Sequence, residues 1–144
     1  MEFEQESSDL PEQMYEALSP LLSLIRTARS ISPGKLGILH TLATEGRASA
    51  ARMRHAIGVS QQAISLTTKE LEGLGLIERH RDEADRRKLW FKLTDAGRQK
   101  LEHEIQLGQR ALMQAIGENL SDEEISLIRA ALPALKKINT AVRP

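Results

Sequence analysis

The most informative segment of the chain is residues 58–97, which read GVSQQAISLTTKELEGLGLIERHRDEADRRKLWFKLTDAG. Ser60 is placed to cap a helix that runs to about Gly73, and Gly75 fits the left-handed position at which helices commonly end. From Leu76 onward the apolar residues alternate, so residues 76–81 and 87–93 predict two strands around a charged loop. The segment therefore predicts a helix followed at once by a β-hairpin.

The residues before this segment predict three further helices. The first is expected to begin with Asp9 as its cap, and Pro20 predicts a kink or a break within it. The second corresponds to residues 32–46, which open with Ser-Pro and close with Glu-Gly, and Ser49 is placed to cap a short third helix. The order is helix, helix and then a helix-turn-helix.

Two long helices are predicted after the hairpin. Thr94 opens the first of them, with apolar residues at helical spacing as far as Ile116. Ser121 and Glu124 form a capping box that opens the second. Because these helices and the first helix carry apolar faces that need a partner, we expect a symmetric dimer.

Composition limits the classes of protein that this chain can belong to. It has 144 residues and no cysteine, which excludes disulfides and thiolate metal sites and suits a reducing cytoplasm. No apolar run approaches the roughly 20 residues that span a bilayer, so we expect a cytoplasmic protein without a membrane segment. The formal net charge is zero, yet basic residues concentrate between Arg79 and Lys100, where they can neutralise phosphates.

The helix that begins after Ser60 is predicted to present a polar face. Ile64 and Leu71 mark its buried side, and a rotation of about 100° per residue places another set opposite them. That outward set is Gln62, Ser65, Leu66 and Lys69. Such side chains read base edges when a recognition helix lies in the major groove, whereas the alternative is an ordinary solvated helix face.

The hairpin loop carries a dense run of charge. Arginine side chains at the tip of a β wing are favoured in a narrow minor groove, and Asp85 is placed to hold Arg87 by a bidentate pair. The alternative is a solvated charged turn. Trp90 is expected to point off the apolar face of its strand, where it packs on the wing or a helix or lies along a phosphate chain.

Residues 58–97 resemble the MarR family of bacterial winged helix-turn-helix regulators. The matching pieces are Gly58-Val59-Ser60, the Leu71 to Arg79 junction with Gly75-Leu76-Ile77, Asp85-Arg86-Arg87, and Leu93-Thr94 followed by Gly97. Each piece is weak by itself, but four in the expected order are specific. The resemblance implies a mainly α fold with a small β-hairpin, in which a winged helix-turn-helix is flanked by dimerisation helices.

The resemblance also divides the chain into regions. Residues 1–9 are expected to be an acidic flexible tail and residues 10–31 an N-terminal dimerisation helix. Residues 32–94 form the DNA-binding region, and residues 95–144 the C-terminal dimerisation helices. The family binds small molecules in a cleft between these regions, and Leu22, Arg26, Leu36 and His40 are the residues we expect to line it.

These observations favour a homodimeric repressor on a pseudopalindromic double-stranded operator, released by a small-molecule effector. The expected DNA-binding residues are Ser60, Gln61, Gln62, Ser65, Leu66, Lys69, Arg79, Arg81, Asp85, Arg86, Arg87, Lys88 and Lys92. We expect no cofactor, metal site or catalytic residues, because the four histidines are scattered and no triad or carboxylate pair appears. The alternatives are a winged-helix module for protein contacts and a constitutive architectural DNA-binding factor.

Overall fold

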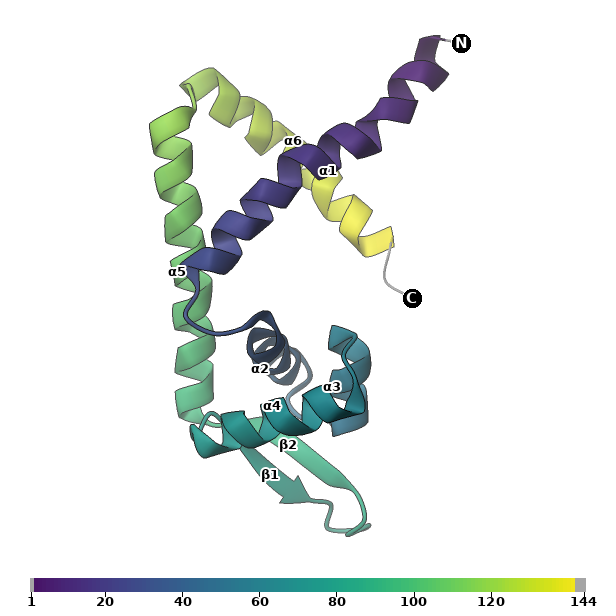
Figure 1. The fold of residues 1–144 in the computed structure, drawn as a ribbon, viewed down its shortest axis with the longest axis vertical. Helices are drawn as coiled ribbons and strands as arrows, with labels where there is room; N and C mark the ends of the chain where they lie inside the picture. The colour runs from purple at the N-terminus through teal and green to yellow at the C-terminus, as the bar shows by residue number, and fades with distance from the viewer. Residues whose placement is uncertain (1, 142–144) are drawn as a thin grey trace.

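The computed structural model describes the backbone of residues 2–141 and the side chains of residues 9–139. Its elements follow one another as six helices with a hairpin after the fourth (Figure 1). They are α1 (Glu2–Ala28), α2 (Pro33–Glu45), α3 (Ala50–Ile57), α4 (Gln61–Gly73), β1 (Ile77–Arg81), β2 (Leu89–Leu93), α5 (Asp95–Asn119) and α6 (Asp122–Ala141). The predicted fold class, mainly α with one small hairpin, is confirmed.

Local capping rules place most of the helix starts. The hydroxyl groups of Ser32, Ser49, Ser60 and Thr94 each accept a hydrogen bond from the backbone N–H three residues later, at the starts of α2, α3, α4 and α5. Ser121 and Glu124 bond reciprocally before α6, as a capping box requires. Gly75 has a φ of 71° and ends the α4 turn, as predicted.

The first helix differs from its prediction. It begins at Glu2 rather than at Asp9, so the segment expected to be a tail, as far as the structure describes it, is helical. Glutamate and glutamine are good helix formers, and they extend α1 beyond the expected cap. The helix also continues through Pro20 instead of breaking there. The prediction placed the start of α1 too late because it depended on a single capping residue, Asp9.

A buried apolar core joins the hairpin to the three short helices. Phe91 on β2 lies at its centre at 2% exposure, with apolar side chains from every neighbouring element. These are Ile38, Leu39 and Leu42 of α2, Met53 of α3, Ile64 and Leu71 of α4, Leu76, Ile77, Leu93 and Leu101. Because one core holds α4 and the hairpin, the two are fixed relative to each other.

The hairpin is antiparallel, with Ile77 opposite Leu93 and Arg81 opposite Leu89. Ala48 adds a single bridge to the other edge of β2, where its N–H and C=O bond to Phe91 at 3.2 and 2.9 Å. This register directs Phe91 into the core and Trp90 to the opposite face. The α2–α3 connection is therefore tied to the base of the wing.

The start of α5 packs directly against the hairpin. A Cβ on Gly97 would lie 1.9 Å from the carbonyl oxygen of Leu76, so only glycine fits at this position. The backbone N–H of Thr94 donates to that same oxygen at 3.1 Å, and the Thr94 hydroxyl donates to the carbonyl of Gly75 at 2.6 Å. The long helix thus leaves the wing at a fixed angle.

A buried polar cluster joins the α1–α2 connection to α5. The Glu104 side chain is fully buried, and its carboxylate accepts hydrogen bonds from the N–H (2.8 Å) and the hydroxyl of Ser30 and from Nζ of Lys100 (2.9 Å). Burial alone raises the pKa of Glu104, but these donors outweigh it and bring the pKa down from 4.5 to about 2. The carboxylate stays charged and holds the segment that follows α1 against α5.

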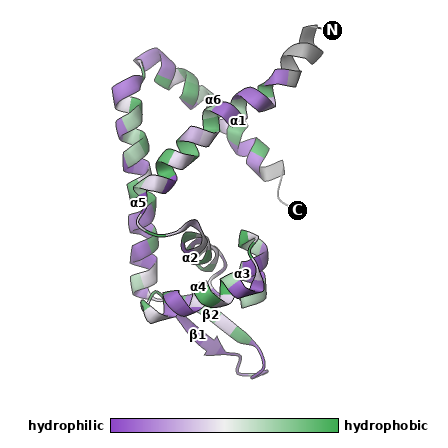
Figure 2. Cartoon of the chain, in the orientation of Figure 1, coloured by the Kyte–Doolittle hydropathy of each residue, from purple (hydrophilic) through white to green (hydrophobic). Residues whose placement is uncertain are grey.

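The helices outside this core leave apolar side chains exposed. α1 crosses α5 where Gly108 lets Ile25 approach, while α6 makes at most marginal backbone contact with the other described elements. Apolar residues recur along α1, the far half of α5 and α6 (Figure 2). The exposed ones include Leu18, Leu21, Leu22, Met113, Ile116, Leu127, Ile128, Leu132 and Ile138. Among the described residues, no helix is both long and apolar enough to cross a bilayer.

Candidate nucleic-acid interface

The outward face of α4 is polar, as predicted. Ile64, Thr68 and Leu71 are buried at 0–3% exposure and hold the helix on the core. The opposite stripe of Gln62, Ser65, Leu66 and Lys69 is exposed, together with Ser60 and Gln61 at the helix start. Leu66 is 60% exposed, an apolar side chain within an otherwise polar stripe.

A groove of about 310 Å³ separates α4 from the core-facing side of the hairpin. Gln61, Ser65 and Lys69 line its helix side, and Arg79 and Leu89 line its strand side. Arg79 is already engaged there. Its guanidinium donates to both carboxylate oxygens of Glu72, at 2.7 and 3.2 Å, and lies 5.4 Å from the centre of the Phe91 ring. Sequence reasoning did not identify Glu72 as its partner.

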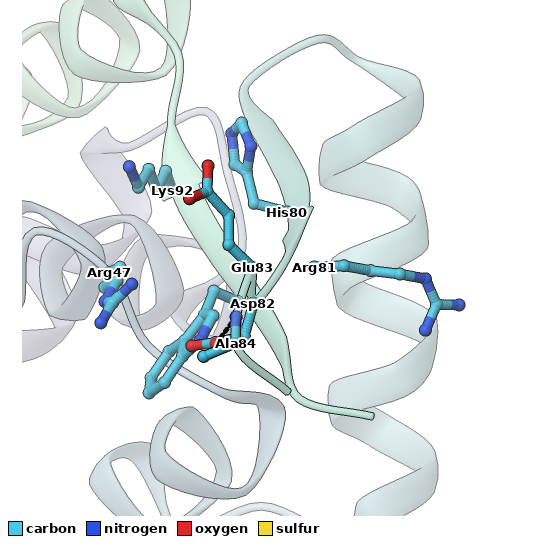
Figure 3. Close-up of a pocket in the computed structure, with 8 residues that line it drawn as sticks. Arg47, His80, Arg81, Asp82, Glu83, Ala84 and Lys92 are labelled. Carbon is cyan, nitrogen blue, oxygen red and sulfur yellow. Dashed lines mark hydrogen bonds between the residues drawn. The ribbon is translucent and has the colours of Figure 1, made fainter. Parts of the chain in front are cut away.

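The remaining predicted basic residues are distributed over both sides of the hairpin. Arg81 points away from Arg47 and Asp82 (Figure 3), and its guanidinium donates to the carbonyl of Arg86 at 2.9 Å. Arg86, Lys88 and Lys92 are exposed. Lys92 follows Trp90 on the outer face of β2, so it does not share the groove side with Arg79.

The wing tip is ordered by two aspartates. One oxygen of Asp85 accepts hydrogen bonds from the N–H of Arg87 at 3.1 Å and from its Nε at 3.2 Å. The predicted bidentate pair is therefore wrong, because both donors of Arg87 bond to the same oxygen of Asp85, only two residues earlier in the turn. The Arg87 side chain remains 93% exposed. One oxygen of Asp82 similarly accepts from the N–H groups of Ala84 and Asp85.

Arg47, in the α2–α3 connection, is the neighbour of the hairpin that sequence reasoning missed, and it packs on Trp90, which points off the apolar face as expected. The indole N–H of Trp90 donates to the second oxygen of Asp82 at 3.0 Å, and the Arg47 guanidinium lies 4.4 Å above the ring. These groups border a hollow of about 330 Å³ on the outer face, between Arg47, His80 and Lys92 (Figure 3). Hydrogen bonds from the Asp85 amide, the indole and the Ala84 amide lower the pKa of Asp82.

A separate cleft of about 400 Å³ lies between the α1–α2 connection, α2, α3 and α5. Leu36 and His40 line it as predicted, but Leu22 and Arg26 are not among its lining residues. Arg29, three residues after Arg26 and just beyond the end of α1, is the basic residue that lines the cleft, and its Nε is buried without a hydrogen-bond partner. Within the described residues, no three histidine or acidic side chains gather closely enough to hold a metal ion.

Comparison with known proteins agrees with this geometry. Residues 35–112, from α2 into α5, match the family model described as "Winged helix DNA-binding domain". The chain belongs to this family. Over 106 residues this winged-helix chain is 26% identical to an uncharacterized HTH-type transcriptional regulator, YdgJ, of Bacillus subtilis. That alignment covers 74% of the chain and 64% of YdgJ, a little under two thirds of the relative's length.

Solved structures extend the likeness to the whole winged-helix chain. A MarR family protein from Bacillus stearothermophilus superposes with a TM-score of 0.73 at 24% identity, over 95% of this chain and 97% of that one. A mutant of E. coli MarR complexed with operator DNA gives a TM-score of 0.60 at 20% identity, over 90% and 95%. The resemblance predicted from residues 58–97 is confirmed at the level of the fold, which this chain shares with MarR family structures.

Proposed function

We propose that this chain is a homodimeric, cytoplasmic transcriptional repressor that binds a pseudopalindromic operator and is released by a small-molecule effector. One observation carries the proposal. The polar stripe of α4 and the arginine-tipped hairpin are held on one core, so that a helix and a wing are presented to the same duplex. The MarR–operator complex has the same fold, which supports duplex DNA as the ligand.

In this proposal α4 lies in the major groove. Gln62, Ser65 and Lys69 read base edges, with Gln61 at the helix start and Leu66 against a thymine methyl group. Ser60 orients the helix and its amide faces a phosphate. Arg86 and Arg87 enter the minor groove, where Asp85 holds Arg87 in place. Arg79, Arg81, Lys88 and Lys92 supply positive charge for the phosphates, with Arg79 first exchanging its Glu72 partner.

A second copy of the chain is the proposed cover for the apolar faces of α1 and α6. α6 projects from the end of α5 with Leu127, Ile128, Leu132 and Ile138 each 44–71% exposed, which is costly for a helix left in water. A two-fold arrangement buries the same residues on both copies. In such a dimer we expect the two α4 helices about one turn of the DNA double helix apart, ~10 bp from centre to centre.

The cleft lined by Leu36, His40 and Arg29 is the proposed effector site. Its walls of Ile57, Leu101 and Ile105 are apolar and Arg29 supplies a positive charge beside them, so a small aromatic carboxylate fits this chemistry. An effector acts only if it prefers the DNA-free arrangement of the lobes. Benzoate is a suitable probe, and equal benzoate affinity with and without bound operator would exclude the coupling.

Selection from a random duplex library, followed by salt titration of the enriched duplex, tests the function. We expect an enriched sequence with two-fold symmetry and a steep fall of log K with log salt concentration. Arg87→Ala should weaken binding about 10-fold or more and reduce the salt slope, while Arg110→Ala on the exposed side of α5 should not. If the protein has no affinity for duplex DNA, the result would favour a winged-helix module for protein contacts. If it binds duplexes without sequence preference, the result would favour an architectural DNA-binding factor.

A further inference from the structure

Trp90 is an unusual residue for the position that it occupies. It lies on the outer face of β2, away from the core around Phe91, and is directly opposite His80 on β1. Outer-face positions of a hairpin are commonly polar, yet Trp90 is only partly exposed and its one polar atom is satisfied. Arg47, from the α2–α3 connection, covers one face of its ring at 4.4 Å. The Trp90 ring is therefore held in a fixed position on the wing by Asp82 and Arg47.

The hydrogen-bond partner of Trp90 organises the loop. Asp82 uses one oxygen for the indole N–H at 3.0 Å and the other for the N–H groups of Ala84 (2.9 Å) and Asp85 (3.0 Å). Three donors thus converge on one carboxylate at the first residue after β1. The indole is the only one of them that comes from outside the loop, so it anchors the carboxylate to the sheet.

The loop in turn fixes the arginine at its tip. The backbone N–H of Asp82 donates to the carbonyl of Lys88 at 3.0 Å, and the N–H of Lys88 donates to the carbonyl of Asp85 at 2.9 Å. Asp85 then accepts from the N–H and Nε of Arg87. A continuous set of contacts therefore runs from Trp90 through Asp82 and Asp85 to Arg87.

We infer that Trp90 is a positioning residue for DNA binding, which acts through Asp82 and Asp85 on Arg87. This inference rests on the proposed function and extends it to a residue on the side of the hairpin opposite α4. A loop that is ordered before binding avoids the entropy cost of ordering it on the duplex. Arg47 contributes by holding the ring in the orientation that directs its N–H to Asp82.

Trp90→Phe is the decisive variant, because it keeps an aromatic ring under Arg47 and removes the N–H donor together with the five-membered ring that carries it. Operator binding should weaken about 5-fold to 10-fold. This is less than a full hydrogen bond to a charged group in each wing contributes, because the variant loosens the loop and removes no contact with DNA. His80→Gln is the matched control, since it changes the facing residue and leaves the Trp90–Asp82 bond in place. The control should bind operator like the wild type.

A double-mutant cycle with Arg87→Ala separates positioning from direct contact. If Trp90 acts through the wing tip, Trp90→Phe should cost almost nothing when Arg87 is already alanine. An undiminished loss in the Arg87→Ala background would mean that Trp90 contacts DNA or supports the whole fold, and either result overturns the inference.

Hydrogen exchange on the free protein gives a readout that does not depend on DNA. The amides of Ala84 and Asp85 should exchange faster in Trp90→Phe than in the wild type and in His80→Gln, and unchanged exchange overturns the inference. If the wild type binds operator and Trp90→Phe binds it equally well, the inference is overturned and the proposed function stands. Failure of the wild type to bind any duplex overturns the proposed function and the inference together.

Discussion

Replacement of Glu104 by glutamine should convert a pH-dependent contribution to stability into a pH-independent one. The folded-state pKa is about 2, against 4.5 for an ordinary glutamate. Because the folded value is the lower one, the ionised carboxylate stabilises the fold above pH 4.5, and this stabilisation is lost as the pH falls toward 2. At 1.36 kcal/mol per pKa unit, the difference between the two pKa values corresponds to about 3 kcal/mol of stabilisation at pH 7. About half of this stabilisation is lost by pH 3.

Urea unfolding of the wild type and Glu104→Gln, at one fixed protein concentration and at several pH values, measures this contribution. The gap in unfolding free energy between the two should narrow by about 1–2 kcal/mol between pH 7 and pH 3. Other carboxylates titrate in both proteins and cancel in the difference. Glu102→Gln, which removes an exposed carboxylate two residues away, should leave the free energy within about 0.5 kcal/mol. A gap that stays constant or widens toward acid would refute the assigned role of the Ser30–Glu104–Lys100 cluster.

Two further substitutions test the packing around α5 and α6. Gly97→Ala should lower the unfolding free energy by about 1–3 kcal/mol, because its Cβ collides with the Leu76 carbonyl, whereas Gly117→Ala, which meets nothing within 4 Å, should be neutral or stabilising by thermal unfolding. Equal melting temperatures for the two variants would contradict the close approach. Leu132→Asp should shift the protein from dimer to monomer in sedimentation equilibrium, while Leu74→Asp, on an exposed leucine at the end of α4, should not. A wild type that sediments as a monomer would exclude the proposed dimer.

Features governed by short-range rules could be predicted from the sequence. Each cap depends on a hydroxyl and an N–H three residues apart, so Ser32, Ser49 and Ser60 identified their helices without tertiary information. The exposed stripe of α4 followed from the helical period in the same way. The position of Gly75 followed from the need for a left-handed residue.

Features that depend on register or on contacts between distant segments could not be predicted. Ser30 and Glu104 are 74 residues apart, and only the crossing of α1 over α5 brings them together. The same crossing, set by Ile25 against Gly108, explains why Arg29 rather than Arg26 reaches the cleft. The hydrogen bond from Trp90 to Asp82 depends on the hairpin register, and no single residue in the loop predicts that register.

The unbroken length of α5 has a mechanical consequence. Its 25 residues rise about 1.5 Å each, so the helix is a stiff arm of roughly 37 Å between the wing at one end and α6 at the other. The α1 crossing at Gly108 lies roughly 20 Å from the wing end of this arm. A tilt of about 10° at the crossing displaces the wing end by about 3 Å, comparable to the rise of one base pair along a DNA strand. In the proposed dimer, a small rearrangement beside the cleft is thus amplified into a change of half-site spacing.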